Sequence, residues 1–295
     1  MRVGFIGIGL MGLPLCHRLL NAGISLQVWN RSAGKLDALI AAGAIPADSP
    51  AAMATHVDVL LLCVSDSAAV ADVMHAEHGI LAGAHAGLIV VDHSSITAEL
   101  TRQLAAELHK QCGATWVDAP VSGGVVGAEQ GRLVIMAGGD ADAISRVTPV
   151  LSHYAQRITR MGDVGAGQVT KICNQLIVAA NSLLIAETVA LAEQAGVDAR
   201  LLAPALAGGF ADSLPFQILA PRMAERRFEP VQWKVQTLLK DLGNAVSLGQ
   251  TVDSPLPLAT AAHTLMQCHA DHGFTRDDLS STVLLHARPS AAEQD

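Results

Sequence analysis

Short apolar runs alternate with helical patterns through the first half of the chain. The run Val57–Val64 is almost continuously apolar, as expected of a parallel strand that is covered on both faces. Between such runs, apolar residues recur at helical spacing, for example in Leu13–Ala22 and Ala33–Ala42. This alternation predicts an α/β fold, a Rossmann-type doubly wound sheet built from βαβ units. The strands are expected at Val3–Ile8, Ser25–Trp29, Val57–Val64, Leu88–Asp92, Thr115–Asp118 and Leu133–Ala137.

The pattern changes after about residue 160. Residues 168–194 contain no Gly or Pro and carry apolar residues at helical spacing, which predicts a helix about 40 Å long at 1.5 Å per residue. No strand is expected after Ala137. We therefore predict an α/β domain over residues 1–163 and an all-α domain over 164–295, which begins with a long interdomain helix at about 168–194. Further helices are expected at Ala199–Ala207, Pro215–Glu225, Trp233–Gly249 and Leu258–His272.

The composition fits a folded protein of two domains. Of 295 residues, 51% are hydrophobic and 16% are charged, so a large core can form and disorder is excluded as the main state. The formal net charge is −8, and no Lys/Arg cluster is longer than Arg226-Arg227, so we expect no nucleic-acid partner. The apolar segment Leu176–Ala192 includes Asn181 and Glu187, which favours a buried helix over a membrane span, and we expect no membrane partner.

Cysteine and histidine usage points away from disulfides and metals. The five cysteines are scattered without CxxC pairs, an odd and unpatterned count that fits a reducing, cytoplasmic location. No pair among His17, His93 and His153 has the spacing of metal ligands, and no metal site is expected. The apolar segment Val3–Leu20 is rich in glycine and fits a strand, turn and helix better than a signal peptide.

Residues 7–12 read Gly-Ile-Gly-Leu-Met-Gly, the form G-x-G-x-x-G, between a predicted strand and a predicted helix. In that context the first glycine permits a tight turn, the second lets the backbone approach a pyrophosphate, and the third lets the helix pack on the sheet. The helix N-terminus adds N–H groups and partial positive charge. An ordinary glycine-rich turn is the alternative. The motif predicts a dinucleotide site that includes Gly7, Gly9, Leu10, Met11 and Gly12.

Asn30-Arg31-Ser32 follow the second predicted strand, where NAD sites usually carry an acid that binds the ribose. No acid stands here to repel a 2′-phosphate, and Arg31 can pair with one through charge-assisted bonds. We therefore expect NADP(H) to be preferred, with NAD(H) as the alternative cofactor if Arg31 is only solvated. Ligands bind outside the carboxyl ends of such strands, which adds candidates near the ribose and nicotinamide at Val64, Ser65 and Ser95.

Two further segments combine polar side chains with glycine turns. Residues 118–124 read Asp-Ala-Pro-Val-Ser-Gly-Gly, and the Ser-Gly-Gly turn can present a hydroxyl and N–H groups to a carboxylate. Lys171 and Asn174 lie three residues apart, on one face of the predicted long helix. Partial burial lowers the pKa of a lysine, so Lys171 could exchange a proton with a substrate oxygen. For this segment alone, a solvated lysine at a helix start is the alternative.

Taken together, these motifs resemble the β-hydroxyacid dehydrogenase family, also called the 3-hydroxyisobutyrate dehydrogenase-like family. The resemblance includes the glycine motif at 7–12, D-A-P-V-S-G-G at 118–124, G-x-G-x-x-x-K-x-x-N at 165–174 and K-D-L at 240–242, and it extends to about residue 285. It implies reversible NAD(P)-dependent oxidation of a small 3-hydroxy acid to its semialdehyde, in an interdomain cleft and without a metal. It also implies a homodimer or homotetramer formed through the all-α domain.

The same resemblance implies roles for single residues. Lys171 would be the general acid and base, and Asn174 would orient the substrate and the lysine. Lys240 would approach the nicotinamide side of the cofactor. The carboxylate of the small substrate would be held by Ser122, Gly123 and Gly124.

Within the family, Asn174–Asn181 and Gly208–Ala211 are similar to the tartronate semialdehyde (2-hydroxy-3-oxopropionate) reductases. The 3-hydroxyisobutyrate dehydrogenases more often have Asn-Asn where this chain has Asn174-Gln175. Phe228–Trp233 departs from both patterns, and Trp233 could reshape the pocket. The open alternatives are therefore 3-hydroxyisobutyrate dehydrogenase, another semialdehyde, glyoxylate or imine reductase, and a non-catalytic NADP-binding module. The intact set of Lys171, Asn174 and Ser122 speaks against the last.

Overall fold

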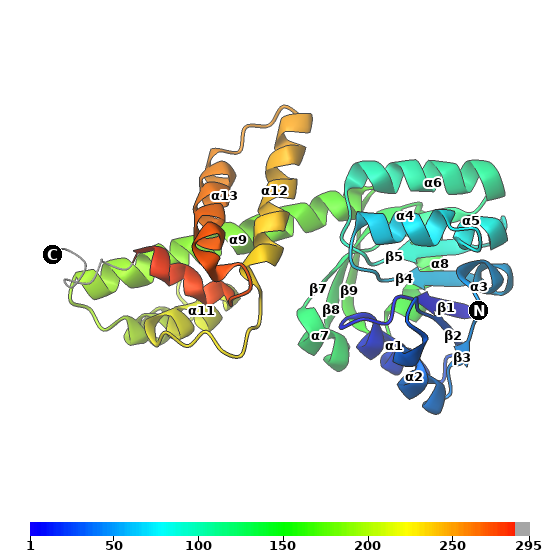
Figure 1. Ribbon diagram of the computed structural model, residues 1–295, viewed down its shortest axis with the longest axis horizontal. Helices are drawn as coiled ribbons and strands as arrows, with labels where there is room; N and C mark the ends of the chain where they lie inside the picture. The colour runs from blue at the N-terminus through cyan, green and yellow to red at the C-terminus, as the bar shows by residue number, and fades with distance from the viewer. Residues whose placement is uncertain (287–295) are drawn as a thin grey trace. The chain divides into compact units, whose positions relative to one another are not determined.

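The computed structural model describes residues 1–286 and divides into two compact units (Figure 1). The first unit comprises Met1–Lys171, and the second begins at Ile172. The division falls inside the long helix α9 (Ala166–Gln194), so the first turns of α9 belong to the first unit. The domain boundary predicted at 163/164 lies a few residues earlier, within the glycine-rich stretch that leads into this helix.

The first unit is built on a nine-stranded sheet in the order β3-β2-β1-β4-β5-β6-β8-β7, with β9 beside β8. From β3 to β6 all neighbours pair in parallel, and β1 and β4 lie side by side from Val3 opposite Val59 to Ile6 opposite Leu62. Their carboxyl ends therefore lie level, as the predicted doubly wound fold requires. The strands are β1 (Val3–Ile6), β2 (Leu26–Trp29), β3 (Ile45–Pro46), β4 (Val59–Leu62), β5 (Ile89–Asp92), β6 (Thr115–Asp118), β7 (Val121–Ser122), β8 (Leu133–Gly139) and β9 (Ala155–Gly162).

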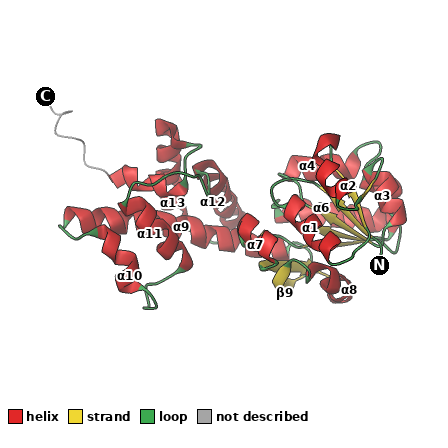
Figure 2. Cartoon of the chain, turned by 90° about the horizontal axis from the view of Figure 1, so that it is seen from below, coloured by secondary structure: helices red, strands yellow, loops and turns green. Residues whose placement is uncertain are grey.

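Helices cover both faces of this sheet (Figures 1 and 2). Phe5 and Ile6 are neighbours in β1, both fully buried, and they belong to different core clusters because successive strand residues point to opposite faces. This is why the central strands read as continuous apolar runs. The core with Phe5 includes residues of α1 (Gly12–Asn21), α2 (Asp37–Ala41), α7 (Gly124–Gln130) and α8 (Ala141–Leu151), and the core with Ile6 includes residues of α3 (Pro50–His56), α4 (Ser67–His75), α5 (Ile80–Gly83) and α6 (Ala98–Cys112).

Three strands were not predicted: the two-residue strands β3 and β7, and the longer strand β9. β9 pairs in parallel with β8, so the expectation of no strand after Ala137 is wrong. Most residues of β9 are exposed, including Arg157 and Arg160, because β9 has a neighbour on one side only and packs few side chains into the core. The apolar periodicity on which strand prediction depends is therefore missing from this segment.

The described residues of the second unit form helices joined by loops, as predicted. Its core gathers around α9, where Ala179, Leu183 and Ala186 pack in one cluster with Leu219 and Leu242 from other helices. A single antiparallel bridge joins Lys234 to Asp278. After α9 come the helical segments η2 (Ala199–Leu201), α10 (Leu202–Leu206), α11 (Leu214–Ala224), α12 (Val235–Thr251), α13 (Pro257–His269), η3 (Ala270–Phe274) and η4 (Leu279–His286).

Helix α9 has 29 residues and combines buried and exposed apolar positions. By length and composition it could cross a membrane, and 39% of its most apolar window is buried within the protein. A core helix passes the same test. Ala179, Ala186 and Val189 of α9 are fully buried in the helical core.

Candidate active site

The glycine-rich loop connects β1 to α1 at the carboxyl edge of the sheet. Gly7 has a φ of 103°, and a Cβ there would approach the Cys63 carbonyl more closely than 3.0 Å. A Cβ on Gly12 would likewise collide with the Gly7 carbonyl, whereas a Cβ on Gly9 would meet nothing within 4 Å. Gly7 and Gly12 thus allow the turn and the close packing of α1. The open backbone at Gly9, and a helix start without a capping side chain or first-turn acid, fit a pyrophosphate.

Asn30, at the end of β2, holds this loop. Its Oδ1 accepts a hydrogen bond from the N–H of Ile8 at 2.9 Å, and its Nδ2 donates to the Ser32 carbonyl at 3.0 Å. The side chain therefore fixes the loop, and its contact with a ribose stays a prediction. Arg31 is exposed and makes no hydrogen bond or ion pair with any residue between 1 and 286, so its guanidinium is available to an anion.

The loops after β4 and β5 are joined to each other. The N–H of Val64 donates to the hydroxyl of Ser94 at 3.0 Å, and Ser95 is exposed beside it. The Ser65 hydroxyl donates to Asp66 at 2.7 Å, and Asp66 in turn caps α4. These loops and the glycine-rich loop lie at the carboxyl edge of the sheet, around the point between β1 and β4 where the strand order reverses. Nucleotides bind to α/β sheets at such a point.

The segment Asp118–Gly124 turns sharply after β6. Ser122 ends the short strand β7 and is partly buried, and α7 begins at Gly124. Gly123 has a φ of 130° and Gly124 a φ of 63°, conformations that side chains with a Cβ rarely adopt. Both glycines are exposed. The sequence of this turn therefore places an uncovered backbone next to the hydroxyl of Ser122.

A buried histidine supports the same turn from below. His93 Nδ1 donates to the Ala119 carbonyl at 2.6 Å, and the hydroxyl of Tyr154 donates to His93 Nε2 at 2.8 Å. Burial lowers the pKa of His93 to about 4, so the ring is neutral near pH 7. A neutral imidazole has one donor and one acceptor nitrogen, which is what these two partners need. His93 therefore has a structural role at this turn.

Polar residues of α9 and α12 in the second unit form a connected row. Asn174 Nδ2 donates to Gln175 Oε1 at 2.8 Å, and Gln175 Nε2 donates to Asp241 Oδ2 at 2.6 Å. Lys240 Nζ lies 3.5 Å from Asp241 Oδ1. Asn174 and Lys240, two residues predicted for the site, are thus linked through Gln175 and Asp241, to which the sequence assigned no role. Asp241 was visible in the K-D-L motif, but no local signal pairs it with a residue 66 positions earlier.

The predicted site residues are divided between the two units. Lys171 is partly buried in the second turn of α9, and Asn174 follows one turn later on the same helix face. Lys240 belongs to the second unit, in α12. Their roles toward cofactor and substrate stay predictions. The first unit holds the remaining ones: Gly7, Gly9, Leu10, Met11, Gly12, Asn30, Arg31, Ser32, Val64, Ser65, Ser95, Ser122, Gly123 and Gly124.

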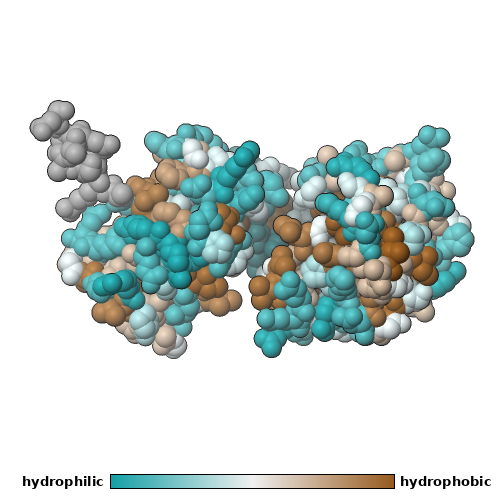
Figure 3. All heavy atoms as spheres, turned by 60° about the horizontal axis from the view of Figure 1, so that its bottom comes forward, coloured by the Kyte–Doolittle hydropathy of each residue, from teal (hydrophilic) through white to brown (hydrophobic). Residues whose placement is uncertain are grey.

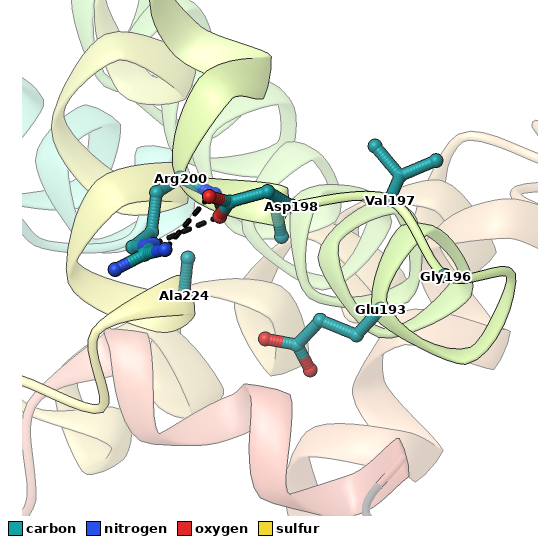
Figure 4. A pocket seen from close by; sticks show the side chains of 7 residues that line it. Glu193, Gly196, Val197, Asp198, Arg200 and Ala224 are labelled. Carbon is teal, nitrogen blue, oxygen red and sulfur yellow. Dashed lines mark hydrogen bonds and ion pairs between the residues drawn. The ribbon is translucent and has the colours of Figure 1, made fainter.

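A separate pocket of about 510 Å³ lies in the second unit, around the end of α9 (Figure 4). Its charged groups are already paired: Arg200 bonds Asp198 at 2.7 Å, and Glu193 bonds Arg226 at 2.7 Å. The pocket contains none of the residues predicted for cofactor or substrate. We assign it no part in the reaction.

Comparison with known proteins agrees with this geometry. Residues 2–162 match the family described as the NAD binding domain of 6-phosphogluconate dehydrogenase, and residues 165–286 match the NAD-binding domain of NADP-dependent 3-hydroxyisobutyrate dehydrogenase. The chain is 34% identical to the 2-hydroxy-3-oxopropionate reductase of Escherichia coli K12 over 284 residues, 96% of each chain.

Two solved structures are similar over almost the whole chain. The 3-hydroxyisobutyrate dehydrogenase of Mycobacterium tuberculosis with L-serine is 27% identical, with a TM-score of 0.86 and coverage of 96% of this chain and 97% of that one. Psf3 in complex with NADP+ and 2-OPP is 30% identical, with a TM-score of 0.83 and coverage of 97% and 100%. Cofactor binding by the glycine-rich loop is therefore supported by both the local geometry and the domain match.

Proposed function

The chain belongs to the β-hydroxyacid dehydrogenase family, and from this premise we propose that it is an NADP(H)-preferring reductase of tartronate semialdehyde (2-hydroxy-3-oxopropionate). Membership makes it an NAD(P)-dependent oxidoreductase that acts on hydroxy acids. The finer proposal names one semialdehyde, one preferred cofactor and Lys171 as the acid and base.

One observation carries the proposal. The carboxyl edge of the sheet carries the glycine-rich loop with its open backbone at Gly9. At the same edge, the end of β6 is hydrogen-bonded to the start of α9, the helix that carries Lys171. An amine that can move a proton thus belongs to the same unit as the proposed nucleotide cradle. The similarity to a 2-hydroxy-3-oxopropionate reductase, at 34% identity over nearly the full length, supports the choice of substrate.

The chemistry divides between the cofactor and the protein. A bound nicotinamide supplies the hydride in reduction and accepts it in oxidation. In reduction, the Lys171 ammonium donates a proton to the aldehyde oxygen and stabilises its developing negative charge; in oxidation, the neutral amine takes the hydroxyl proton back. Asn174 directs its Nδ2 at Gln175, which leaves its Oδ1 to accept a hydrogen bond from a substrate hydroxyl.

The substrate carboxylate would bind at the turn after β6. The hydroxyl of Ser122 and the backbone of Gly123 and Gly124 are donors there, and both glycines are exposed. Two or three hydrogen bonds to a carboxylate fix the distance of the neighbouring carbon atoms. A small acid with an aldehyde two bonds from its carboxylate carbon therefore suits a lysine held at a fixed place on a helix.

Arg31 supports the preference for NADP(H). It is exposed directly after β2, and its neighbour Asn30 is neutral and already bonded to the glycine-rich loop. A 2′-phosphate there would meet a planar cation and no carboxylate in the Asn30–Ser32 segment.

The test is cofactor oxidation against a panel of substrates. NADPH and NADH are each supplied with tartronate semialdehyde, methylmalonate semialdehyde, succinic semialdehyde and glyoxylate, and initial rates are compared. The proposal predicts the highest kcat/KM with tartronate semialdehyde and NADPH. A different semialdehyde as the best substrate would overturn the substrate assignment and retain the reductase.

Trp233 supplies the reason to extend the panel to imines. The N–H groups of Gln232 and Trp233 donate to the buried carboxylate of Asp278 at 2.7 and 3.2 Å, so this stretch of backbone is fixed. The indole is 42% exposed and stands in a segment that departs from the family pattern. Activity with a cyclic imine and silence with every semialdehyde would favour the imine reductase alternative. NADPH binding with no turnover at all would favour a non-catalytic module.

A homo-oligomer formed through the second unit is also part of the proposal. Ile177, Leu184 and Leu191 on α9 are seven residues apart and at least 60% exposed, so they form one apolar stripe. Figure 3 shows hydrophobic side chains among hydrophilic ones on the molecular surface. Light scattering of the purified protein tests this part, with a homodimer or homotetramer expected.

A further inference from the structure

The first turn of α9 takes its capping group from a distant strand. It contains no acidic residue of its own. Instead Asp118, at the end of β6, accepts a hydrogen bond from the N–H of Gly165 at 2.7 Å with Oδ1 and from the N–H of Gln168 at 2.9 Å with Oδ2. These partners lie 47 and 50 residues later in the chain. A carboxylate in this place also suits the positive end of the helix dipole.

Glycines enclose the carboxylate of Asp118, which is fully buried. A Cβ on Gly138 would lie 2.6 Å from Asp118 Oδ1, and a Cβ on Gly167 would lie 2.8 Å from Oδ2. Real Cβ atoms do not come so close, so the start of α9 can sit this near to β6 and β8 only because both positions are glycine. The contact is therefore close and leaves little freedom to the first turn.

Gln168 ties the same turn to a second strand end. Its side chain is 1% exposed, its Nε2 donates to the Ser94 carbonyl at 2.8 Å, and its Oε1 accepts from the N–H of Ile96 at 3.3 Å. Ser94 in turn holds Val64 through its hydroxyl. The first turn of α9 is thus bonded to the loops that carry the predicted cofactor residues Val64 and Ser95.

We infer that Asp118 and Gln168 are positioning residues, which fix the first turn of α9 and thereby the place of Lys171 relative to the cofactor loops. The inference rests on the proposed function, in which Lys171 moves the proton. Both oxygens of Asp118 and both polar atoms of Gln168 are bonded to backbone groups. Neither side chain needs to touch the substrate, and each acts on the reaction through the helix that carries Lys171 three residues after Gln168.

Asp118→Asn is the first variant. An amide has one oxygen, so it can accept from Gly165 or from Gln168 but not from both, and its NH2 group faces the other N–H. The matched control is Asp140→Asn. Asp140 caps α8 by accepting one hydrogen bond, from the N–H of Ala143 at 2.8 Å, which an amide oxygen can keep.

Gln168→Met is the second variant, and it decides the matter if Asp118→Asn does not fold. Methionine has a similar length and cannot bond Ser94 or Ile96. Its control is Gln217→Met in α11, which removes a partly buried glutamine that donates to the Ala203 carbonyl at 3.0 Å. All rates are expressed per cofactor-binding site, so that unfolded protein does not count as slow enzyme.

The expected result is a split between kcat and binding. Asp118→Asn and Gln168→Met lower kcat by roughly 10²-fold, the effect of misplacing a catalytic group by about 1 Å, whereas both controls keep the wild-type kcat. The KM for the semialdehyde and the Kd for NADPH change far less. A wild-type kcat in either folded variant, or an equal loss in its control, would overturn the inference.

A double variant shows whether the effect passes through Lys171. In the Lys171→Ala background, Asp118→Asn should change the residual single-turnover rate by no more than about twofold, because nothing remains to be positioned. A further loss of roughly 10²-fold there would show that Asp118 acts independently of Lys171 and would overturn the inference. If Lys171→Ala alone retained full turnover, the proposed function itself would fail, a result that the single variants cannot produce.

Discussion

Gly9 and Gly12 belong to one motif, but the structure predicts opposite consequences for adding a methyl group to each. A Cβ on Gly9 meets nothing within 4 Å, and its φ lies outside the left-handed region, so Gly9→Ala should change the free energy of unfolding by less than about 0.5 kcal/mol. A Cβ on Gly12 would clash with the Gly7 carbonyl and lie 3.0 Å from the ring of Phe5. Gly12→Ala should therefore cost about 1–3 kcal/mol, as overpacking does.

For cofactor binding we expect the substitution at Gly9 to have the more direct effect. The pyrophosphate is expected in the empty space over Gly9, so a methyl group there would clash with the ligand and not with the protein. We expect Gly9→Ala to raise the Kd for NADPH at least about tenfold, which corresponds to about 1.4 kcal/mol. Gly87→Ala is the matched control, since its Cβ would meet only the His85 ring at 3.5 Å, and Gly87 lies before β5, at the amino edge of the sheet.

Urea unfolding gives the stability of each variant, and titration of NADPH fluorescence gives its Kd. The informative pattern is a Gly9→Ala protein that is as stable as the wild type and binds NADPH weakly. If Gly9→Ala bound NADPH as tightly as Gly87→Ala did, the pyrophosphate could not lie over Gly9. If Gly12→Ala were as stable as the wild type, the close packing of α1 on β1 would be misjudged.

Three other predictions test separate parts of the account. Arg31→Asp should move the ratio of kcat/KM values for NADPH and NADH toward NADH, because a carboxylate repels the 2′-phosphate, and an unchanged ratio would remove Arg31 from cofactor selection. Burial raises the pKa of Asp92 from 3.8 to about 7, so the folded protein holds a proton that the unfolded chain releases, and stability is lost as the pH rises from about 4 to 7. Asp92→Asn should therefore gain up to roughly 4 kcal/mol relative to the wild type between pH 4 and pH 8 in urea unfolding, and a difference independent of pH would refute this. Leu184→Asp should shift the protein toward monomers in light scattering if the stripe on α9 joins two copies, whereas Val252→Asp, at an equally exposed site in the second unit, should not.

The sequence predicts those parts of the fold that depend on local patterns. The continuous apolar run Val57–Val64 predicts β4 because a central strand is buried on both faces. The long segment without Gly or Pro predicts α9 because such a helix needs continuous helical spacing. β9 was missed because it packs few apolar side chains, and its place beside β8 is decided by backbone pairing.

The candidate site divides in the same way. The glycine motif is readable because it occupies six consecutive residues between a strand and a helix, and the structure agrees with the turn and packing roles of Gly7 and Gly12. The contacts of Asp118 with α9 and of Gln175 with Asp241 were not readable, since each joins residues about fifty or more positions apart. Asp118 stood inside a recognised motif, yet only the folded chain shows that its carboxylate caps a helix.

The central claim is that Lys171 moves the proton, and the most direct measurement is the turnover of Lys171→Ala with NADPH and tartronate semialdehyde beside its affinity for NADPH. The account predicts a loss of kcat of at least about 10²-fold, the usual contribution of a general acid, with an unchanged Kd for NADPH. Turnover comparable to that of the wild type, with the cofactor bound equally well, would contradict it.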